Sequence, residues 1–208
     1  METPNPEAFW TWFASHEREL ADIVAGATEG RVTEQLDQAL TRHGLSFVYD
    51  VTGPPAGAEL AFTPEGDPAR AVLGDSFVEG APMLTRWVVH SRRQRKPLPQ
   101  ALSFVRALHG IDLSNASFDV RLHEGRYHVR FQHNELVQRG EDERFAVAAS
   151  FLDHALGEAV AMTYIGGVDF AERTEGGIDM AIAVNQLLAE AGDVPARETT
   201  ADLAPTAS

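Results

Sequence analysis

Three polar residues inside an apolar stretch are the first candidates for chemistry. Asp153, His154 and Glu158 lie within FLDHALGE, and the spacing of four between His154 and Glu158 places both on one face of a helix. An imidazole beside a carboxylate can bind a metal ion or move a proton, so one hypothesis is a metal-assisted hydrolase completed by a histidine from the predicted sheet. The other interpretation is that these residues cap and orient the helix end, where the helix dipole favours histidine. Because a metal site needs about three protein ligands, we expect the capping role.

A cationic segment, SRRQRKPLP, is the second candidate. It carries Arg92, Arg93, Arg95 and Lys96 within five residues and ends in two prolines. Burying so many unpaired cations would be very costly, so we expect an exposed loop. The loop is compatible with binding an anion or an acidic protein, and equally with an ordinary solvated turn.

A predicted β-hairpin supplies the third candidate. Apolar and polar residues alternate over 118–123 and 127–132, on either side of a Glu124-Gly125 turn. One face is therefore core, and the other gathers four basic side chains: Arg121, His123, His128 and Arg130. This face is either a binding surface or the water-facing side of an antiparallel sheet, and the second is the commoner situation.

Established catalytic and cofactor motifs are missing from the sequence. We find no glycine pattern for phosphate or dinucleotide binding, no GxSxG nucleophile turn and no HExxH zinc helix. With no cysteine, disulfides, thiolate metal sites and a cysteine nucleophile are excluded. We therefore expect no cofactor and favour a non-enzymatic protein.

Composition limits the partners and the compartment. The chain has 208 residues, of which 44% are hydrophobic, and a net charge of −14 that opposes binding to nucleic acid or to an anionic membrane. No apolar run approaches the roughly 20 residues of a membrane helix, and METPNPEAFW does not resemble a secretory signal. These features predict a cytoplasmic protein.

The charge is unevenly distributed along the chain. Residues 86–139 carry ten basic and four acidic side chains, whereas both flanking segments are strongly acidic. The middle segment can attract an acidic partner or pair with the protein's own acidic flanks, and we favour self-pairing.

The spacing of apolar residues predicts the elements that position these candidates. Helices are expected from Pro6, with Asn5 as the cap, and over 28–42, 67–80, 101–109, 145–156 and 178–191. Strands are expected over 45–51, 58–63, 84–90, 118–122, 127–131 and 160–168. The aromatic FWTWF cluster of the first helix is expected to dock on the sheet, although exposed it would mark a partner surface.

Three segments together resemble a family of uncharacterised bacterial proteins. They are the FWTWF start, VEGAPMLTRWVVHSRRQR and FLDHALGEAVAMTYIGGVDF, which match the family's FWxWF, AP-x-L-x-x-W and LLD-x-x-LGE patterns. The resemblance implies a shared α+β fold across most of the chain. It carries no assigned activity and transfers no catalytic residue.

We predict one α+β domain over residues 1–192 and a disordered tail over 193–208. The domain is expected to hold a mostly antiparallel sheet of about five or six strands, flanked by the N-terminal, central and C-terminal helices. The leading functional hypothesis is a binding or accessory protein that recognises an acidic protein through the Arg92–Lys96 loop and the polar hairpin face. The alternatives are the metal-assisted hydrolase and a structural protein that forms homo-oligomers through FWTWF.

Overall fold

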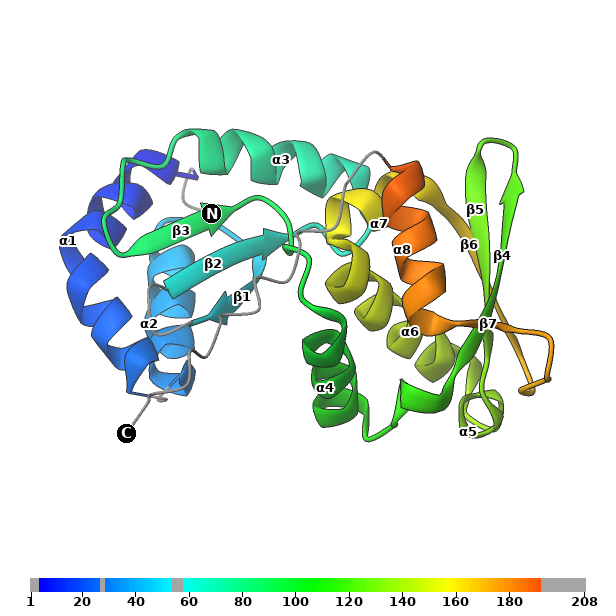
Figure 1. Ribbon diagram of the computed structural model, residues 1–208. Helices are drawn as coiled ribbons and strands as arrows, with labels where there is room; N and C mark the ends of the chain where they lie inside the picture. The colour runs from blue at the N-terminus through cyan, green and yellow to red at the C-terminus, as the bar shows by residue number, and fades with distance from the viewer. Residues whose placement is uncertain (1–3, 27–28, 54–57, 192–208) are drawn as a thin grey trace, which may run out of the picture.

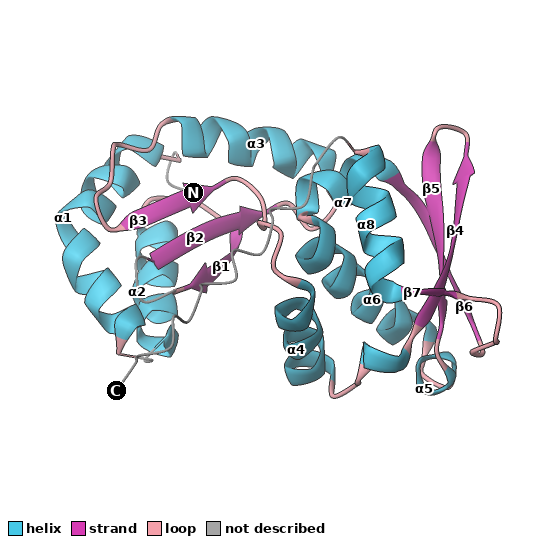
Figure 2. Ribbon diagram, viewed as in Figure 1, coloured by secondary structure: helices cyan, strands magenta, loops and turns pink. Residues whose placement is uncertain are grey.

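The computed structural model describes residues 4–26, 29–53 and 58–191, and these residues form helices around two β-sheets (Figures 1 and 2). The elements of the first half are α1 (Pro6–Ala25), α2 (Glu29–Arg42), β1 (Val48–Thr52), β2 (Ala58–Thr63), α3 (Pro68–Glu79) and β3 (Trp87–His90). Those of the second half are α4 (Leu98–His109), a 3-10 turn (Leu113–Asn115), β4 (Ser117–His123), β5 (Arg126–Gln132), α5 (Asn134–Val137), α6 (Glu141–Leu156), α7 (Glu158–Tyr164), β6 (Ile165–Ala171), β7 (Ile178–Asp179) and α8 (Met180–Glu190).

The first sheet has the order β1-β2-β3. β1 and β2 pair antiparallel, as predicted, while β3 pairs parallel to β2 after the α3 crossover. The apolar residues of β2, Leu60 and Phe62, pack into a core cluster supplied by α1, α2 and α3. The opposite face of the sheet carries the alternate residues of these strands, and it is this face that contributes to the candidate site.

The aromatic start of α1 is internal. Asn5 Oδ1 accepts a hydrogen bond from the Ala8 amide at 3.0 Å, which confirms the predicted cap. Phe9, Trp10 and Phe13 are buried, and Trp10 Nε1 donates to the Phe77 carbonyl of α3 at 2.8 Å. The predicted docking is thus confirmed, and it takes most of the cluster's apolar surface away from an oligomer interface.

The second sheet has the order β6-β5-β4-β7. The predicted β4–β5 hairpin is confirmed, and Glu124 and Gly125 both adopt the positive φ angles that a tight hairpin turn requires. Phe118 and Phe131, from its inner face, contact the Phe151 ring of α6. Figure 1 shows α6 and α8 between this sheet and the rest of the molecule.

The apolar run after Gly157 differs from the prediction. Residues 158–164 form the helix α7, and the strand expected over 160–168 begins only at Ile165. A short apolar run fits a buried helix as well as a buried strand, and the alanines of EAVAMTY favour the helix. Gly157, with φ +85°, provides the bend of 114° between α6 and α7.

Two apolar residues of the predicted helices 145–156 and 178–191 lie outside the core. Phe145 is 44% exposed and Ile182 is 61% exposed, because the buried stripes of α6 and α8 are each rotated away from them. On α8 the buried stripe follows helical spacing through Met180, Ala183, Val184, Leu187 and Leu188.

The α+β class is confirmed, but the strands form two sheets of three and four instead of one. Most of the strand pairings are antiparallel, and each sheet also has one parallel pair. The buried apolar residues form two clusters, one with each sheet, so the predicted domain over 1–192 contains two cores.

The tail predicted over 193–208 lies outside the described residues. Within the described part of the chain no single helix is long and apolar enough to cross a membrane; α6 and α7 satisfy that criterion only when taken together across their bend.

Candidate functional site

The Arg92–Lys96 loop joins β3 to α4, and its cations are paired with carboxylates of the same chain. Arg92 Nη2 donates to Asp75 Oδ2 at 2.9 Å, and Lys96 Nζ lies 3.0 Å from Glu59 Oε2. Both basic side chains are at most one quarter exposed. The expected exposed loop is therefore wrong, and the self-pairing that we favoured is confirmed for these residues, since pairing removes most of the cost of burial.

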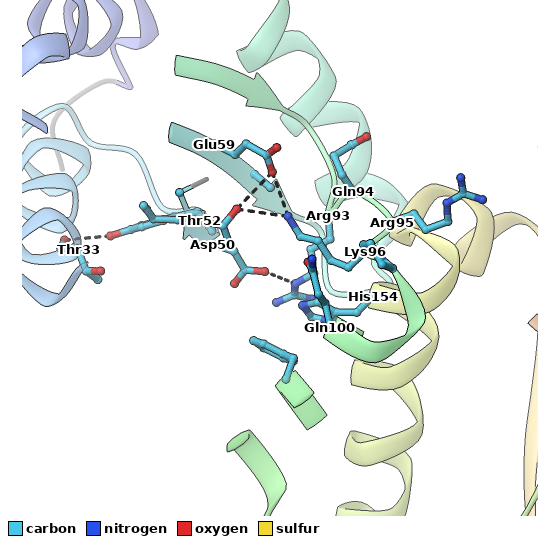
Figure 3. A pocket seen from close by; sticks show the side chains of 16 residues that line it. Thr33, Asp50, Thr52, Glu59, Arg93, Gln94, Arg95, Lys96, Gln100 and His154 are labelled. Carbon is cyan, nitrogen blue, oxygen red and sulfur yellow. Dashed lines mark hydrogen bonds and ion pairs between the residues drawn. The ribbon is translucent and has the colours of Figure 1, made fainter. Parts of the chain in front are cut away.

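Arg93 is the most extensively paired cation of this loop. Its guanidinium contacts Asp50 of β1 at 2.5 Å and Asp153 of α6 at 3.4 Å. It thereby links the first sheet to the central helix of the second core. Arg95 differs, because it has no ion pair among the described residues and its Nη1 is buried without a hydrogen bond; its side chain extends away from the other cations (Figure 3).

Glu158, at the start of α7, is fully buried. Its Oε1 accepts hydrogen bonds from the Thr63 hydroxyl at 2.6 Å and the Glu65 amide at 3.1 Å, and its Oε2 accepts one from the Arg93 amide at 3.1 Å. Its own amide donates to the Arg93 carbonyl at 3.0 Å. Glu158 therefore ties β2 and the basic loop to α7.

Asp153 and His154 point to different surroundings, although they are adjacent in sequence. Burial, and secondarily the charge of Glu158, raises the pKa of Asp153 to about 7, against the opposing effect of Arg93. The His154 ring stacks on Phe104 of α4 at 3.9 Å, and burial lowers its pKa.

The metal site of the alternative hypothesis requires Asp153, His154 and Glu158 to converge, and they do not. Glu158 is engaged by backbone and hydroxyl donors, Asp153 pairs with Arg93, and His154 faces Phe104. Across residues 4–26, 29–53 and 58–191, no group of three or more His, Asp or Glu side chains is placed to hold a metal ion. The helix-end interpretation fits His154, which lies in the last turn of α6 with its Nδ1 2.8 Å from the Ser150 carbonyl. Glu158 makes no capping bond within α7 and instead ties the start of that helix to β2 and the basic loop.

A cavity of about 830 Å³ opens between the first sheet and the α4–α6 layer, and the basic loop forms one of its walls (Figure 3). β1 contributes Tyr49 to Thr52, β2 contributes Glu59 and Ala61, and Phe104 and His154 provide a stacked pair of rings. The remaining lining residues are Thr33, Gly53, Arg93, Gln94, Arg95, Lys96, Pro97 and Gln100.

Most of the charges that line this cavity are paired, and Arg95 adds a positive charge outside these pairs. Asp50 faces Arg93, and Glu59 faces Lys96, which also lies 3.4 Å from the Thr52 hydroxyl. The Lys96 ammonium lowers the pKa of Glu59 against the opposing effect of burial, so the Glu59 side chain is a carboxylate at neutral pH. The cavity thus offers donors and acceptors, together with the Arg95 cation, which has no ion pair among the described residues.

The polar face of the β4–β5 hairpin lies elsewhere. Arg121 pairs with Asp119 at 2.6 Å, and Arg130 lies 3.6 Å from Asp169 of β6. The His128 and His123 rings are 5.2 Å apart, so the predicted gathering of these side chains is present. Since α6 and α8 cover the inner face of this sheet, however, the polar face and the basic loop are on opposite sides of the helical layer and do not form one surface (Figure 1).

Sequence reasoning missed the sheet side of the cavity. Asp50, Thr52 and Glu59 occupy alternate positions of β1 and β2, and Thr52 is the cross-strand partner of Glu59. Aligning the two strands of the predicted hairpin in register would have brought these polar residues together. Their position opposite the cationic loop would then have indicated the site. The contribution of Phe104 and Gln100 carried no comparable signal.

Comparisons of the chain with protein-family models, with curated proteins and with solved structures find no significant match. The resemblance to uncharacterised bacterial proteins therefore stays a prediction, and any functional argument depends on the site itself.

Gly157 controls how closely the basic loop approaches the α6–α7 bend. We expect Gly157→Ala to lower the free energy of unfolding by about 2–3 kcal/mol, since its backbone angles suit only glycine. An added Cβ would also lie 3.3 Å from the Arg95 amide nitrogen. Urea denaturation measures the change.

The matched control for this variant is Gly30→Ala. Gly30 lies within α2, and a Cβ there would meet nothing within 4 Å, so helix propensity predicts a gain of up to about 1 kcal/mol. Equal effects of the two substitutions would contradict the role given to Gly157.

Proposed function

We propose that the protein is a non-enzymatic binding protein whose recognition site is the cavity between the first sheet and the α4–α6 layer. The observation that carries this proposal is the cavity itself. Its volume of about 830 Å³ is within the usual range for ligand sites, and it combines an aromatic wall with convergent polar groups.

The charge pairs favour a ligand of small net charge. The loop cations Arg92, Arg93 and Lys96 already have carboxylate partners, which an acidic protein would have to displace, and Arg95 alone of the four loop cations is outside an ion pair among the described residues. A ligand that offers both donors and acceptors can instead use the side-chain amide of Gln94 and leave the ion pairs in place. The proposal therefore keeps the basic loop as a wall of the site and replaces the acidic partner.

The titration behaviour favours binding over acid–base chemistry. Asp153 has the pKa nearest neutrality, yet it is not among the side chains that line the cavity. A general acid or base must reach the reacting proton directly or through one water molecule. His154 does line the cavity and is neutral at pH 7, because burial lowers its pKa. Its Nδ1 is 2.8 Å from the Ser150 carbonyl and its ring stacks on Phe104, so we assign it to the aromatic wall of the site.

We expect Gln100→Trp to block ligand binding. Gln100 lies on the exposed surface of α4 at the cavity wall, so an indole there fills the site without disturbing either core. The test measures Tm for the wild type and the variant against amino acids, sugars, nucleosides and a pool of random peptides. A ligand at about 100 times its Kd stabilises the wild type by about 2.7 kcal/mol, which raises Tm by roughly 5–10 °C.

Gln100→Ala is the matched control, and it should keep a shift close to that of the wild type. The proposal is wrong if no compound raises the Tm of the wild type, or if Gln100→Trp responds as strongly as the wild type does.

A further inference from the structure

The cavity runs along the free edge of β1. This strand is at the end of the order β1-β2-β3, and it contributes consecutive residues, Tyr49 to Thr52, to the lining. Successive side chains of a strand point to opposite faces, so a lining of consecutive residues means that the cavity surrounds the edge. β2, in contrast, contributes only the alternate residues Glu59 and Ala61.

The hydrogen-bond pattern shows which backbone groups of β1 point outward. The Ala58 amide donates to the Arg86 carbonyl at 3.1 Å, so the backbone of Ala58 faces β3. Since successive residues of a strand direct their backbone groups to opposite sides, Glu59 and Ala61 face β1. Their cross-strand partners are Thr52 and Asp50, which therefore face β2.

It follows that Tyr49 and Val51 direct their N–H and C=O groups into the cavity. Within the described part of the chain, no hydrogen bond to either residue's backbone is found on that side. Unpaired edge groups of this kind are a template for an added strand.

We propose that the ligand is an extended peptide segment of a partner protein, which adds to β1 as a further strand. This inference rests on the proposed function and specifies its ligand. The peptide exchanges backbone hydrogen bonds with Tyr49 and Val51, and its side chains alternate between the two faces of the enlarged sheet.

The cavity walls define the peptide's side chains. The face next to Asp50 and Glu59 has its charges neutralised by Arg93 and Lys96, so it accepts uncharged polar side chains. Phe104 is 38% exposed and stacked on His154, which provides a surface for one apolar or aromatic side chain. The expected segment is therefore extended, of low net charge and without proline at the positions that pair with β1.

The test selects peptides from a phage-displayed random library with the wild-type protein and measures their affinities for Val51→Pro and Val51→Ala. Proline removes the outward N–H of Val51 without removing a bond to β2, whereas alanine shortens the side chain and keeps that N–H. We expect selected peptides to bind Val51→Ala with near wild-type affinity and Val51→Pro at least about tenfold more weakly. Methylating the peptide amide nitrogen that faces β1 should weaken binding to the wild type by a similar factor. This measurement tests backbone pairing even if Val51→Pro fails to fold.

Each contrary outcome identifies what has failed. If no peptide is selected, but small molecules raise the Tm of the wild type and not of Gln100→Trp, the strand-addition inference is wrong and the binding function stands. Selected peptides that bind Gln100→Trp unchanged bind outside the cavity and contradict both. Equal binding to Val51→Pro and Val51→Ala, with no effect of amide methylation, excludes backbone pairing. A dimer of the wild type that Val51→Pro dissociates would make a second copy of this chain the occupant instead.

Discussion

The Glu158→Ala variant is expected to unfold at a Tm about 10 °C below that of the wild type. Its carboxylate is fully buried and accepts three hydrogen bonds, from Thr63, Glu65 and Arg93. Removing it leaves these donors without a partner, and each buried unsatisfied group costs about 1–3 kcal/mol. Breaking a buried charged network by deleting one member typically costs about 3–5 kcal/mol, and each kcal/mol lowers the Tm of a chain of this size by about 2–4 °C.

The position of Glu158 predicts a second effect in the same variant. Its partners lie on β2, on the turn that follows β2 and on the loop after β3, whereas α7 belongs to the second core, so these bonds couple the two core clusters. We expect calorimetry of Glu158→Ala to give a van't Hoff enthalpy below the calorimetric enthalpy, as unfolding becomes less cooperative.

Two further variants distinguish the effect of losing the hydrogen-bond network from the effect of losing a carboxylate in general. Glu158→Gln keeps an acceptor for Thr63 and Glu65 but turns an amide toward the Arg93 N–H, so its Tm should lie between those of the wild type and Glu158→Ala. Glu34→Ala removes an exposed carboxylate of α2 and should change stability by less than about 0.5 kcal/mol. If the Tm of Glu158→Ala lies within about 2 °C of the Tm of Glu34→Ala, the hydrogen-bond network contributes little to stability.

Local patterns in the sequence were sufficient for most of the elements. Asn5, the Glu124-Gly125 turn and the alternation on either side of it define α1, β4 and β5 through contacts between near neighbours, which spacing encodes directly. The run after Gly157 could not be assigned in the same way, because a short apolar segment suits a buried helix and a buried strand equally. Tertiary contacts of Glu158 with β2 fix the start of α7, and they involve residues more than 90 positions apart.

The candidate site depended even more on distant contacts. The cations Arg92, Arg93 and Lys96 were visible in the sequence, but their carboxylate partners lie on four other elements, α3, β1, β2 and α6. The charge imbalance between the middle segment and its flanks was the only available sign of this pairing, and it carries no information about which residues meet. The division of the strands into two sheets could not be predicted either, because the alternation of apolar and polar residues identifies a strand but not the strand that pairs with it.

The free energy of unfolding is expected to decrease as pH rises from about 4 to about 7. The Asp153→Asn variant should lack the part of this decrease that comes from Asp153. Burial and the charge of Glu158 raise the pKa of Asp153 from an ordinary value of 3.8 to about 7. Throughout this window the folded protein keeps a proton that the unfolded chain releases. The stabilising contribution of protonated Asp153 is therefore complete below about pH 4 and is lost as pH rises through the folded-state pKa.

Burial is the largest reason that Asp153 holds its proton, and three neighbouring groups modify its effect on the pKa. Arg93 is the cation that faces it, at 3.4 Å, but the same guanidinium also contacts Asp50 at 2.5 Å. Glu158, whose carboxylate accepts from the Arg93 amide, adds further negative charge to the cluster. One guanidinium thus serves more than one carboxylate, and a neutral Asp153 relieves the excess.

The measurement is the free energy of unfolding of both proteins by urea at several pH values between 4 and 8. Each unit of pKa displacement corresponds to about 1.4 kcal/mol, so the stability of Asp153→Asn relative to the wild type should rise by roughly 2–4 kcal/mol across this range. The comparison uses the change with pH and not the absolute difference, because asparagine also alters the contact with Arg93. Asp169→Asn, which removes an exposed carboxylate beside Arg130, should follow the wild-type pH dependence. Parallel curves for the wild type and Asp153→Asn would mean that Asp153 is ionised in the folded protein at neutral pH, and that Arg93 accommodates all three carboxylates at once.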